Sequence, residues 1–478
     1  MKPIKLITSL ALVSTLLTSL AAAAETIRIG IGTQDTTINC AAGGAVVREL
    51  KLLEKYLPRD GKYKDAKYDI VWHNFPSGPP LNNELLANKL DIGNMADFPS
   101  ILGRAAFDTA RNGVRTLYIA TLSGGINGAG NAVLVPIGSR VQSFADLKGK
   151  RISVPFGSTG HAMLLRAIKD QGWDPERDVS IVSQAPEVGG SALKANQIDA
   201  HANFVPFGEL FPFRGIARKI YDGSSTGVTT THGVQVRSDF AEKYPELVVA
   251  YLKATLEASR LLREKPEELS EKLAAWTGVE AEVYYAFHGP AGIQTRDFTL
   301  KPEFVSAIRK AEVTLRELKK TDRQVNVDDF VTDRFIRQAA KEFGADYDAR
   351  LADYNPLPLE GTAEDSGAPI TEPKLAGQIW VKGEAKVRLY SSPEATLAAA
   401  KRIQAEGKTV RVTYLHDRTS GNKLFADKVW YVNHQGKLAA FLLKASADEW
   451  ATKNGGAVVA FEDAQKVSGE LSAQTAQR

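Results

Sequence analysis

The sequence has very little cysteine and no dominant charge. One cysteine among 478 residues cannot form an internal disulfide and cannot supply a cysteine-rich zinc or iron–sulfur site. The 60 Lys and Arg residues are nearly balanced by 56 Asp and Glu residues, so no overall field steers the chain onto nucleic acid. With 44% hydrophobic and 24% charged residues, the composition is that of a folded protein. The length suffices for about three compact units.

No apolar stretch beyond residue 24 is long enough to cross a bilayer. The first 24 residues differ, because Lys2 and Lys5 precede an apolar run from Leu6 to Leu20, and four alanines end at Ala24. This order predicts a secretory signal peptide cleaved near Ala24. A membrane anchor is the alternative, but the run is short and contains several Ser and Thr residues. We therefore expect an exported, soluble, periplasmic protein.

Short apolar runs alternate with helical patterns from residue 26 onward. Ile27–Ile31 and Tyr68–Trp72 have the pattern of strands, whereas Ala45–Tyr56 and Pro80–Lys89 have the pattern of helices. The alternation predicts an α/β fold made of right-handed βαβ units with parallel strands. Crossings near residues 120–130 and 229–236 predict two lobes, and the stretch from 239 to 351 is mainly helical.

A segment rich in Pro, Gly and small polar residues separates the lobes from the last hundred residues. Its composition, over residues 355–373, is typical of a linker without fixed structure. Strand patterns beyond it, at 378–389, 409–415, 428–433 and 438–443, and helical patterns at 393–406 and 446–453 predict a small α+β domain. The expected organisation is a signal peptide (1–24), lobe 1 (25–119 plus 235–354), lobe 2 (120–234), a linker (355–374), a C-terminal domain (375–467) and a tail (468–478).

Polar turns follow three of the predicted strands, at residues 32–37, 93–98 and 156–161. In open α/β sheets, ligands bind at the carboxyl ends of the strands. In the third turn, free N–H groups and the positive end of a helix suit an anionic group, and the Ser158 and Thr159 hydroxyls could add donors. The alternative is that Ser158 or Thr159 only caps the helix, and the two roles are compatible.

The histidines do not show the spacing of a metal site. His161, after a strand, and His232, at a predicted crossing, are candidates for donors to a ligand. Cys40 could be activated at a helix start, but a buried small apolar role is favoured. The motifs of serine hydrolases, P-loop proteins and dinucleotide-binding enzymes are absent from the sequence. We therefore expect a binding protein that is not an enzyme, with no cofactor and no nucleic-acid partner.

Four segments resemble one known family. Asp146–His161 (DLKGKRISVPFGSTGH), Lys89–Asp97 (KLDIGNMAD), Ala192–Ala200 (ALKANQIDA) and residues 240–266 are similar, in the same order, to motifs of the nitrate/sulfonate/taurine-type substrate-binding proteins of ABC transporters. The resemblance covers residues 26 to 351. It implies a two-lobed type II periplasmic-binding-protein fold that closes on a small solute like a Venus flytrap. It also implies delivery of the solute to an inner-membrane permease and its ATPase.

The resemblance further implies a set of ligand-binding residues. They lie after strands, at a helix start and near the second crossing: Gln34, Thr36, Asn94, Asp97, Ser158, Thr159, His161, Phe204 and His232. Phe204 stands near the position of a family tryptophan and is expected to form an aromatic wall. The acidic Asp97 suits a bare anion poorly and leaves a zwitterionic or neutral solute open. Nitrate, sulfonates, taurine, aromatic acids and pyrimidines all remain possible on membership alone.

The C-terminal domain has a fainter resemblance to the accessory lipoprotein of nitrous-oxide reductase, which handles copper. The similar segments are Trp430–Val432, Leu438–Phe441, Ala447–Ala451 and Gly455–Ala464. The Cys and Met ligands of that family have no counterpart here, so we expect its fold without its metal.

Two alternatives to solute binding remain open. One is a copper-handling or assembly factor that acts through the C-terminal domain, where His416 and His434 could bind Cu(II). The other is an enzyme like the pyrimidine synthases of this superfamily, and it is disfavoured because their Cys-rich motif is absent.

Overall fold

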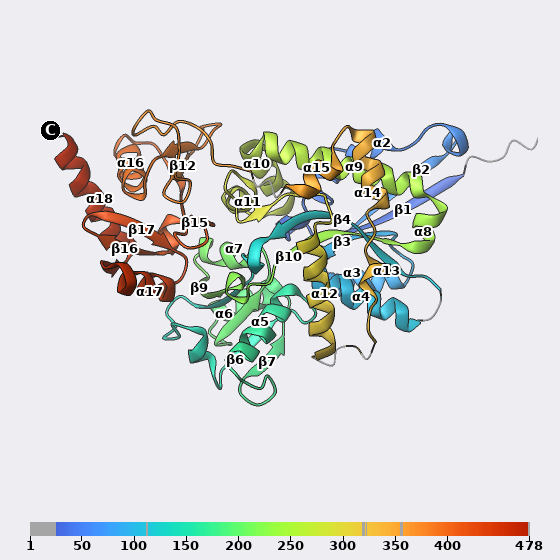
Figure 1. Cartoon of the computed structure of the whole chain (residues 1–478), viewed down its shortest axis with the longest axis horizontal. Helices are drawn as coiled ribbons and strands as arrows, with labels where there is room; N and C mark the ends of the chain where they lie inside the picture. Colours follow the sequence, from blue (N-terminus) through green and yellow to red (C-terminus); the bar gives the residue numbers. More distant parts are fainter. Residues whose placement is uncertain (1–24, 111–112, 318–320, 322, 354–356, 477–478) are drawn as a thin grey trace, which may run out of the picture.

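The computed structural model describes residues 25–110, 113–317, 321, 323–353 and 357–476. The predicted signal peptide lies outside these residues. Within the described ranges, no helix combines the length and the apolar character that a bilayer crossing needs. Figure 1 shows two α/β bodies, one at the right and one below, and a third body at the left that holds the C-terminal elements.

The first lobe is built on a six-stranded sheet with the order β11-β4-β10-β3-β1-β2. Its strands are β1 (Thr26–Thr33), β2 (Lys67–Asn74), β3 (Ile92–Ala96), β4 (Thr116–Gly125), β10 (Thr230–Arg237) and β11 (Gln294–Thr295). As the alternation of the sequence predicts, β1 pairs in parallel with β2 and β3. β10 is antiparallel to β3 and β4. The alternating Ile27, Ile29 and Ile31 are buried, so burial of apolar surface holds this sheet against its helices.

The helices of this lobe come from two stretches of the sequence, one before lobe 2 and one after it. They are α1 (Ala45–Glu49), α2 (Leu52–Tyr56), α3 (Gly78–Leu86), α4 (Asp97–Ala110), α8 (Ser238–Lys243), α9 (Pro245–Glu264), α10 (Pro266–Thr277), α11 (Ala281–His288), α12 (Pro302–Glu317), α13 (Val327–Phe330), α14 (Arg334–Phe343) and α15 (Tyr347–Ala352). Short 3-10 turns lie at η1 (Ile38–Cys40) and η2 (Gly61–Tyr63).

The helix predicted over Ala45–Tyr56 is two helices. They meet at Lys51, whose backbone is left-handed with φ 51°. After this break, the adjacent Leu52 and Leu53 are both buried. Burying two leucines is worth more than the cost of one left-handed non-glycine residue, which is about 1–2 kcal/mol.

The second lobe has a five-stranded sheet with the order β7-β6-β8-β5-β9. Its elements are β5 (Ala132–Pro136), η4 (Phe144–Leu147), β6 (Arg151–Val154), α5 (Thr159–Asp170), β7 (Ser180–Ser183), α6 (Pro186–Lys194), β8 (Ala200–Asn203), α7 (Phe207–Phe213) and β9 (Ala217–Asp222). β6 is parallel to β7 and β8, whereas β5 is antiparallel to β8 and β9. The chain passes between the two sheets through η3 (Ile126–Gly128) and η5 (Gly223–Thr226).

The C-terminal body has two small antiparallel sheets, ordered β13-β12-β14-β15 and β17-β16-β18. Its elements are β12 (Gly377–Val381), β13 (Arg388–Tyr390), α16 (Pro393–Ala405), β14 (Val410–His416), β15 (Lys423–Phe425), η6 (Ala426–Lys428), β16 (Trp430–His434), β17 (Lys437–Phe441), α17 (Lys444–Asn454), β18 (Ala457–Val459) and α18 (Phe461–Ala476). The strand predicted over 378–389 is a hairpin, because Gly383 has φ 85° and turns the chain between β12 and β13. The tail expected from residue 468 continues α18 as far as Ala476.

The segment expected to be a free linker is held at several of its described residues, although most of its side chains are exposed. The carbonyl of Leu357 accepts from Ala291 N (2.8 Å), and Glu364 N donates to Leu389 O (2.9 Å). Ala363 is 1% exposed. The Pro and Gly residues here shape turns that lie on folded structure, so composition alone overstated the freedom of this segment.

The C-terminal body is anchored on lobe 1 through α10 and α11. Arg411 of β14 pairs with Glu271 and Glu282, both at 2.7 Å. The ring of Tyr285 on α11 lies 5.4 Å from Trp380 and 5.5 Å from Tyr414, as measured between centroids.

The same body also contacts lobe 2, because Phe425 of β15 packs on Phe213 of α7 at 5.1 Å between ring centroids. Figure 1 shows β15 beside α7. The C-terminal body therefore contacts both lobes.

Candidate functional site

The turn that follows β1 is fixed by side chains from three other elements. Asn39 donates from Nδ2 to Nδ1 of His232 on β10 (3.0 Å). His288, at the end of α11, donates from Nε2 to the carbonyl of Ile38 (3.0 Å). Ser123 Oγ on β4 donates to the carbonyl of Asn39 (3.3 Å). These contacts bring the carboxyl end of β1, the antiparallel pair β4–β10 and α11 to one place.

Arg296 follows β11 and lies beside this turn. It is 5% exposed, yet none of its three guanidinium nitrogens has a hydrogen-bond partner within the described ranges. Its charge acts on the ionisation of Cys40, Tyr284 and His288, which are its neighbours. Burial lowers the pKa of Arg296 to about 9, so the guanidinium stays charged at neutral pH. A buried cation without a partner is unfavourable, and an anion is the partner that its forked geometry fits.

Both histidines of this site are neutral. Burial lowers the pKa of His232 to about 3, and burial together with Arg296 lowers the pKa of His288 well below its ordinary value. His232 accepts from Asn39 at Nδ1, so its proton is on Nε2, which is a donor. His288 donates from Nε2, which leaves Nδ1 as a buried acceptor without a partner among the described residues. The site therefore offers one cation, one neutral donor and one neutral acceptor.

Further polar atoms around this place are buried and unpaired in the described part of the chain. They come from the turn after β1, from β4, β10 and β11, and from the first crossing: Thr37 Oγ1, Asn39 Oδ1, Thr121 Oγ1, Thr230 Oγ1, Gln294 Oε1 and Asn131 Oδ1. Buried polar atoms normally have partners. Their concentration at the carboxyl end of β1, where α/β sheets bind ligands, favours this place as the solute site.

Two of the predicted residues, Gln34 and Asn94, hold the lobe together. Asn94 is fully buried, and the two hydrogens of its Nδ2 are shared among three acceptors, the carbonyls of Gly32 and Gly43 (both 3.2 Å) and the Tyr251 hydroxyl oxygen (2.8 Å). Its Oδ1 accepts from the same hydroxyl (3.0 Å). Gln34 donates to the backbone carbonyl of Asn94 (2.9 Å). The hydrogen-bonding positions of the Asn94 side chain are thus occupied within lobe 1, which argues against its expected role in solute binding.

Asp97 lies at the start of α4 and is buried. Its Oδ1 accepts from Phe98 N (2.7 Å) and its Oδ2 from Thr231 N (3.1 Å), so it ties α4 to β10. Burial raises its pKa to about 6, while the two N–H groups and Arg166 of lobe 2 oppose that rise. The carboxylate is thus partly compensated inside the protein, which weakens the objection that it would repel an anion.

The turn before α5 has the geometry of a capped helix start. Ser158 Oγ accepts from His161 N (3.2 Å) and donates to the carbonyl three residues earlier (2.7 Å). His161 Nδ1 accepts from Gly157 N (3.2 Å), and its ring stacks on Phe156 at 4.7 Å and 6°. The capping interpretation is confirmed, and binding of an anion here stays a prediction.

The other predicted residues are found on both lobes. Thr36 is half-buried in the turn after β1, Thr159 is buried in the first turn of α5, and Phe204 is 4% exposed. Phe204 packs edge-on against Phe207 at 5.6 Å, so most of its ring is held in the protein interior. Its expected role as an aromatic wall stays a prediction.

The lobes touch along α4 and α5. A methyl group at Gly157 would lie 3.0 Å from Pro79 and 3.1 Å from Leu102, both in lobe 1. Ala162 of α5 belongs to the same apolar cluster as Phe98. This edge is therefore closed in the structure.

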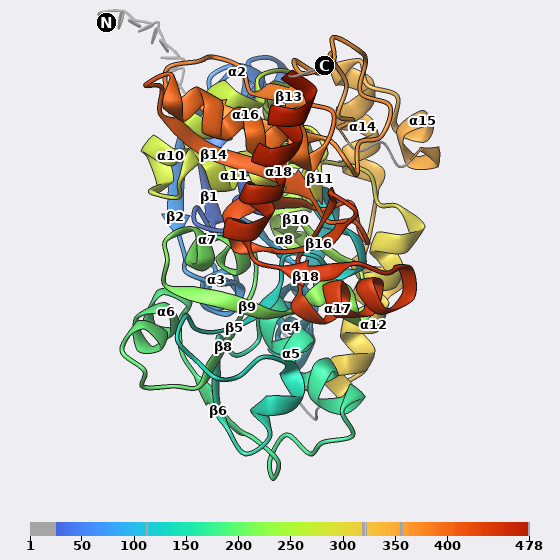
Figure 2. The ribbon, with the colours of Figure 1, turned by 90° about the vertical axis from the view of Figure 1, so that its left-hand side faces the viewer.

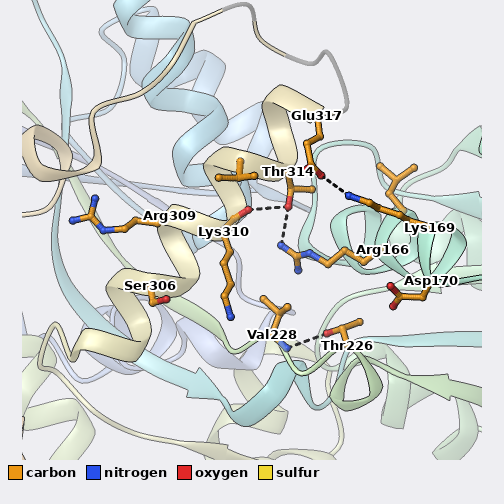
Figure 3. Close-up of a pocket in the computed structure, with 12 residues that line it drawn as sticks. Arg166, Lys169, Asp170, Thr226, Val228, Ser306, Arg309, Lys310, Thr314 and Glu317 are labelled. Carbon is orange, nitrogen blue, oxygen red and sulfur yellow. Dashed lines mark hydrogen bonds and ion pairs between the residues drawn. The ribbon is translucent and has the colours of Figure 1, made fainter.

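A cavity of about 450 Å³ lies at the same boundary, between α5, the second crossing and α12. Figure 3 shows Arg166 and Lys169 of α5 facing Thr314 and Glu317 of α12. Arg166 Nη2 donates to Thr314 Oγ1 (3.2 Å), and Lys169 pairs with Glu317 (3.1 Å). The ion pair is well exposed, at 72% and 52%, and exposed pairs are worth only about 0–1 kcal/mol. The Lys169–Glu317 pair therefore adds little to the hold between α5 and α12.

The structure gives the surroundings of Cys40 and the positions of the histidines considered for copper. Cys40 is buried, as expected, and burial raises the pKa of its thiol, which disfavours a nucleophilic thiolate. Among the described residues, no three His, Cys, Asp or Glu side chains are grouped as metal ligands. His416 is on β14 and His434 is on β16, in different sheets.

Known proteins share this arrangement. Residues 112–269 match the family model described as NMT1/THI5 like. The taurine-binding periplasmic protein of Escherichia coli (strain K12) is 28% identical over 290 residues, which are 57% of this chain and 86% of that protein. The alkanesulfonate-binding protein SsuA of Xanthomonas axonopodis pv. citri, bound to MOPS, has a TM-score of 0.54 at 24% identity, over 65% of this chain and 100% of that one.

The two lobes resemble the sulfonate- and taurine-type binding proteins. The two-lobed fold and the family resemblance expected from the motifs are therefore confirmed. The periplasmic nitrate-binding protein NrtA of Synechocystis PCC 6803 has the same fold, with a TM-score of 0.51 at 15% identity, over 73% of this chain and 95% of that one. The resemblance of the C-terminal domain stays a prediction.

Sequence reasoning missed Arg296 and His288. Arg296 follows a strand of two residues, which is too short to show a period of two, inside a stretch that is otherwise helical. His288 is the last residue of α11, far from any strand end in the sequence. The polar run from Gln294 to Asp297, directly after Gly289–Ile293, is the available signal of a turn that carries polar side chains.

Proposed function

We propose that this chain is the periplasmic solute-binding component of an ABC importer and that it captures a small sulfonate-like anion such as taurine. The observation that supports the anion is Arg296, a buried guanidinium with no partner among the described residues. The names of the similar proteins support the sulfonate class. Export through a cleaved signal peptide and delivery to a membrane permease with its ATPase belong to the same proposal.

The site binds the solute in the following way. The forked guanidinium of Arg296 binds two oxygens of a sulfonate, and the Nε2 proton of His232 supplies a neutral donor. The unpaired Nδ1 of His288 accepts from a donor group such as the amine of taurine. Since Arg296 is already dehydrated, the anion gains a charge-assisted bond without a further desolvation cost for the protein.

Closure of the lobes secures the bound solute. A ligand shifts an open–closed equilibrium only if it interacts differently with the two states. Lobe 1 supplies Arg296 and His232, and we infer that lobe 2 supplies the start of α5 with Ser158, Thr159 and His161. The binding cycle ends when the solute is released to the permease, and no covalent bond of the solute is broken.

Substitution of Arg296 tests the anion site. We expect Arg296→Met to weaken taurine or ethanesulfonate binding at least 30-fold, because removing one partner of a buried charge pair costs about 2–5 kcal/mol. The ligand-free protein should become more stable, because the variant removes an unpaired buried charge. Calorimetric titration and thermal unfolding measure the two effects.

Arg260→Met is the control, since Arg260 on α9 is exposed, pairs with Glu264 at 2.7 Å and should leave affinity unchanged. Full affinity in Arg296→Met, or a ligand-free form less stable than wild type, would contradict the site.

A further inference from the structure

Another cavity lies between lobe 2 and the C-terminal body. Its volume is about 340 Å³, within the range of small-molecule sites, which occur preferentially at domain interfaces. None of the residues of the sulfonate site lines it. Figure 1 shows α7 and β9 of lobe 2 beside β15 of the C-terminal body, and Figure 2 shows β16 near the same two elements. Residues of all four elements line the cavity.

Much of the wall of this junction cavity is apolar. The carbon-rich side chains come from both parts: Ile137, Pro212, Leu424, Phe425, Trp430, Leu442 and Phe461. Ile137 is 56% exposed, which is unusual for a large apolar side chain, and it lies where a bound molecule would cover it. Such a wall suits an aromatic or branched aliphatic body.

Lobe 2 contributes a buried acceptor. Glu209 of α7 is 8% exposed, and its Oε1 pairs with Lys219. Its other oxygen, Oε2, is buried with no hydrogen-bond partner in the described ranges. Lys219 also pairs with Asp222 (2.9 Å), so its single charge is shared between two carboxylates. Burial raises the pKa of Glu209 to about 7, which shows how poorly its charge is compensated.

The C-terminal body contributes a buried amine. Burial lowers the pKa of Lys423 well below its ordinary value, so its charge needs an acidic partner beside it. Lys423 of β15 lines the cavity and is 1% exposed, and its Nζ has no hydrogen-bond partner within the residues described. The ammonium group lies 4.2 Å from the ring centroid of Tyr285 and 5.2 Å from that of Tyr414. Glu267 acts on it electrostatically, but its carboxylate is already bonded to Lys386. Aromatic faces compensate a buried ammonium only in part.

From these three features we infer that the junction cavity binds a small zwitterion with an aromatic or branched apolar body, of the size of an apolar amino acid. Its ammonium group pairs with Glu209 Oε2, its carboxylate pairs with Lys423 Nζ, and its body packs on Phe425, Trp430 and Phe461. Each end of the molecule satisfies a group that the protein leaves unpaired, and this favours a zwitterion over a molecule with one charge.

Three probes test the inference on the full chain by calorimetric titration: L-phenylalanine, phenethylamine, which lacks the carboxylate, and 3-phenylpropanoate, which lacks the amine. We expect L-phenylalanine to bind at least tenfold more tightly than either of the others. Glu209→Gln should weaken L-phenylalanine and phenethylamine but not 3-phenylpropanoate. Lys423→Met should weaken L-phenylalanine and 3-phenylpropanoate but not phenethylamine.

Leu442→Trp provides a second variant that fills the cavity and keeps both charges, so it should abolish L-phenylalanine binding even if a charge variant fails to fold. Absence of L-phenylalanine binding at millimolar concentration, equal binding of a one-ended probe, or full affinity in Leu442→Trp would overturn the inference. Taurine binding and its loss in Arg296→Met do not depend on this result, so the two sites are tested separately.

Discussion

At the residue scale, burial decides what the ionisable groups of this protein do. Three ionisable side chains are deeply buried and have polar atoms without a hydrogen-bond partner among the described residues: Arg296, Glu209 and Lys423. Each lies in a proposed site, where a ligand would supply the missing partner. His201 in lobe 2 is the contrasting case, because both ring nitrogens are used: Ser153 Oγ at 2.7 Å from Nδ1 and Asn203 Nδ2 at 2.9 Å from Nε2. A fully bonded neutral histidine stabilises the fold, whereas the unpaired groups lower stability until a ligand binds.

The pH dependence of stability follows from His201. Burial lowers its folded-state pKa to about 3, against an unfolded value near 6.5. The unfolded chain therefore takes up more protons in this window, so the contribution of neutral His201 is complete above pH 6.5 and is lost as the pH falls toward 3. Urea titrations should show that the loss of unfolding free energy between pH 7 and pH 4 is smaller in His201→Gln, by roughly 3 kcal/mol. An equal loss in variant and wild type would contradict this assignment.

At the element scale, two features of the helices lead to predictions: the capped start of α5 and the break between α1 and α2. The start of α5 is capped by Ser158 and lies against lobe 1, whereas α1 and α2 are separated by left-handed Lys51. The first arrangement places donors at a lobe boundary, and the second stores a small backbone strain far from the proposed site.

The start of α5 should respond differently to two substitutions. Ser158→Ala should lower the unfolding free energy by about 1 kcal/mol, because it removes the N-cap. Ser158→Ala combined with His161→Ala should also weaken sulfonate binding strongly while the fold remains intact. Urea unfolding and calorimetric titration separate the two effects, and unchanged affinity in the double variant would remove the start of α5 from the solute site.

The break at Lys51 predicts a gain in stability. Lys51→Gly should raise the unfolding free energy by about 0.5–1 kcal/mol, because glycine adopts a positive φ without the strain of a Cβ. Lys51→Ala removes the same charge but keeps the Cβ, so it should give no such gain. Thermal melts of the two variants compare them directly, and equal shifts would rule out backbone strain as the cause.

At the scale of the whole molecule, we propose that the C-terminal body limits how far the lobes open. It is held on lobe 1 by Arg411 and on lobe 2 by Phe425, so opening the lobes must break or slide the second contact. Phe213→Ala should therefore give a ligand-free protein with a larger radius of gyration in small-angle scattering. The ligand-bound form should be unchanged. A ligand-free form of unaltered size would show that this contact does not restrain the lobes.

The sequence predicted the α/β order, the family resemblance and the cap at Ser158, because these depend on local patterns and on motifs. It did not predict the role of Asn94, whose partners Gly43 and Tyr251 are 51 and 157 residues away. It also missed Arg296, since only the assembled fold shows that a guanidinium is buried without a partner. From composition alone, residues 355–373 were predicted to have no fixed structure. Hydrogen bonds to residues distant in the sequence, Ala291 and Leu389, hold the described part of that segment.

The aromatic contact of Tyr285 with Trp380 and Tyr414 has a thermodynamic consequence. The three rings are essentially inaccessible to solvent, so separating the C-terminal body from α11 would expose an extended apolar surface to water. The lobes and the C-terminal body should therefore melt in one calorimetric transition, with a single heat-capacity step that scales with all three parts. A chain ended at residue 374 would lose this shared surface and should aggregate on heating rather than unfold reversibly.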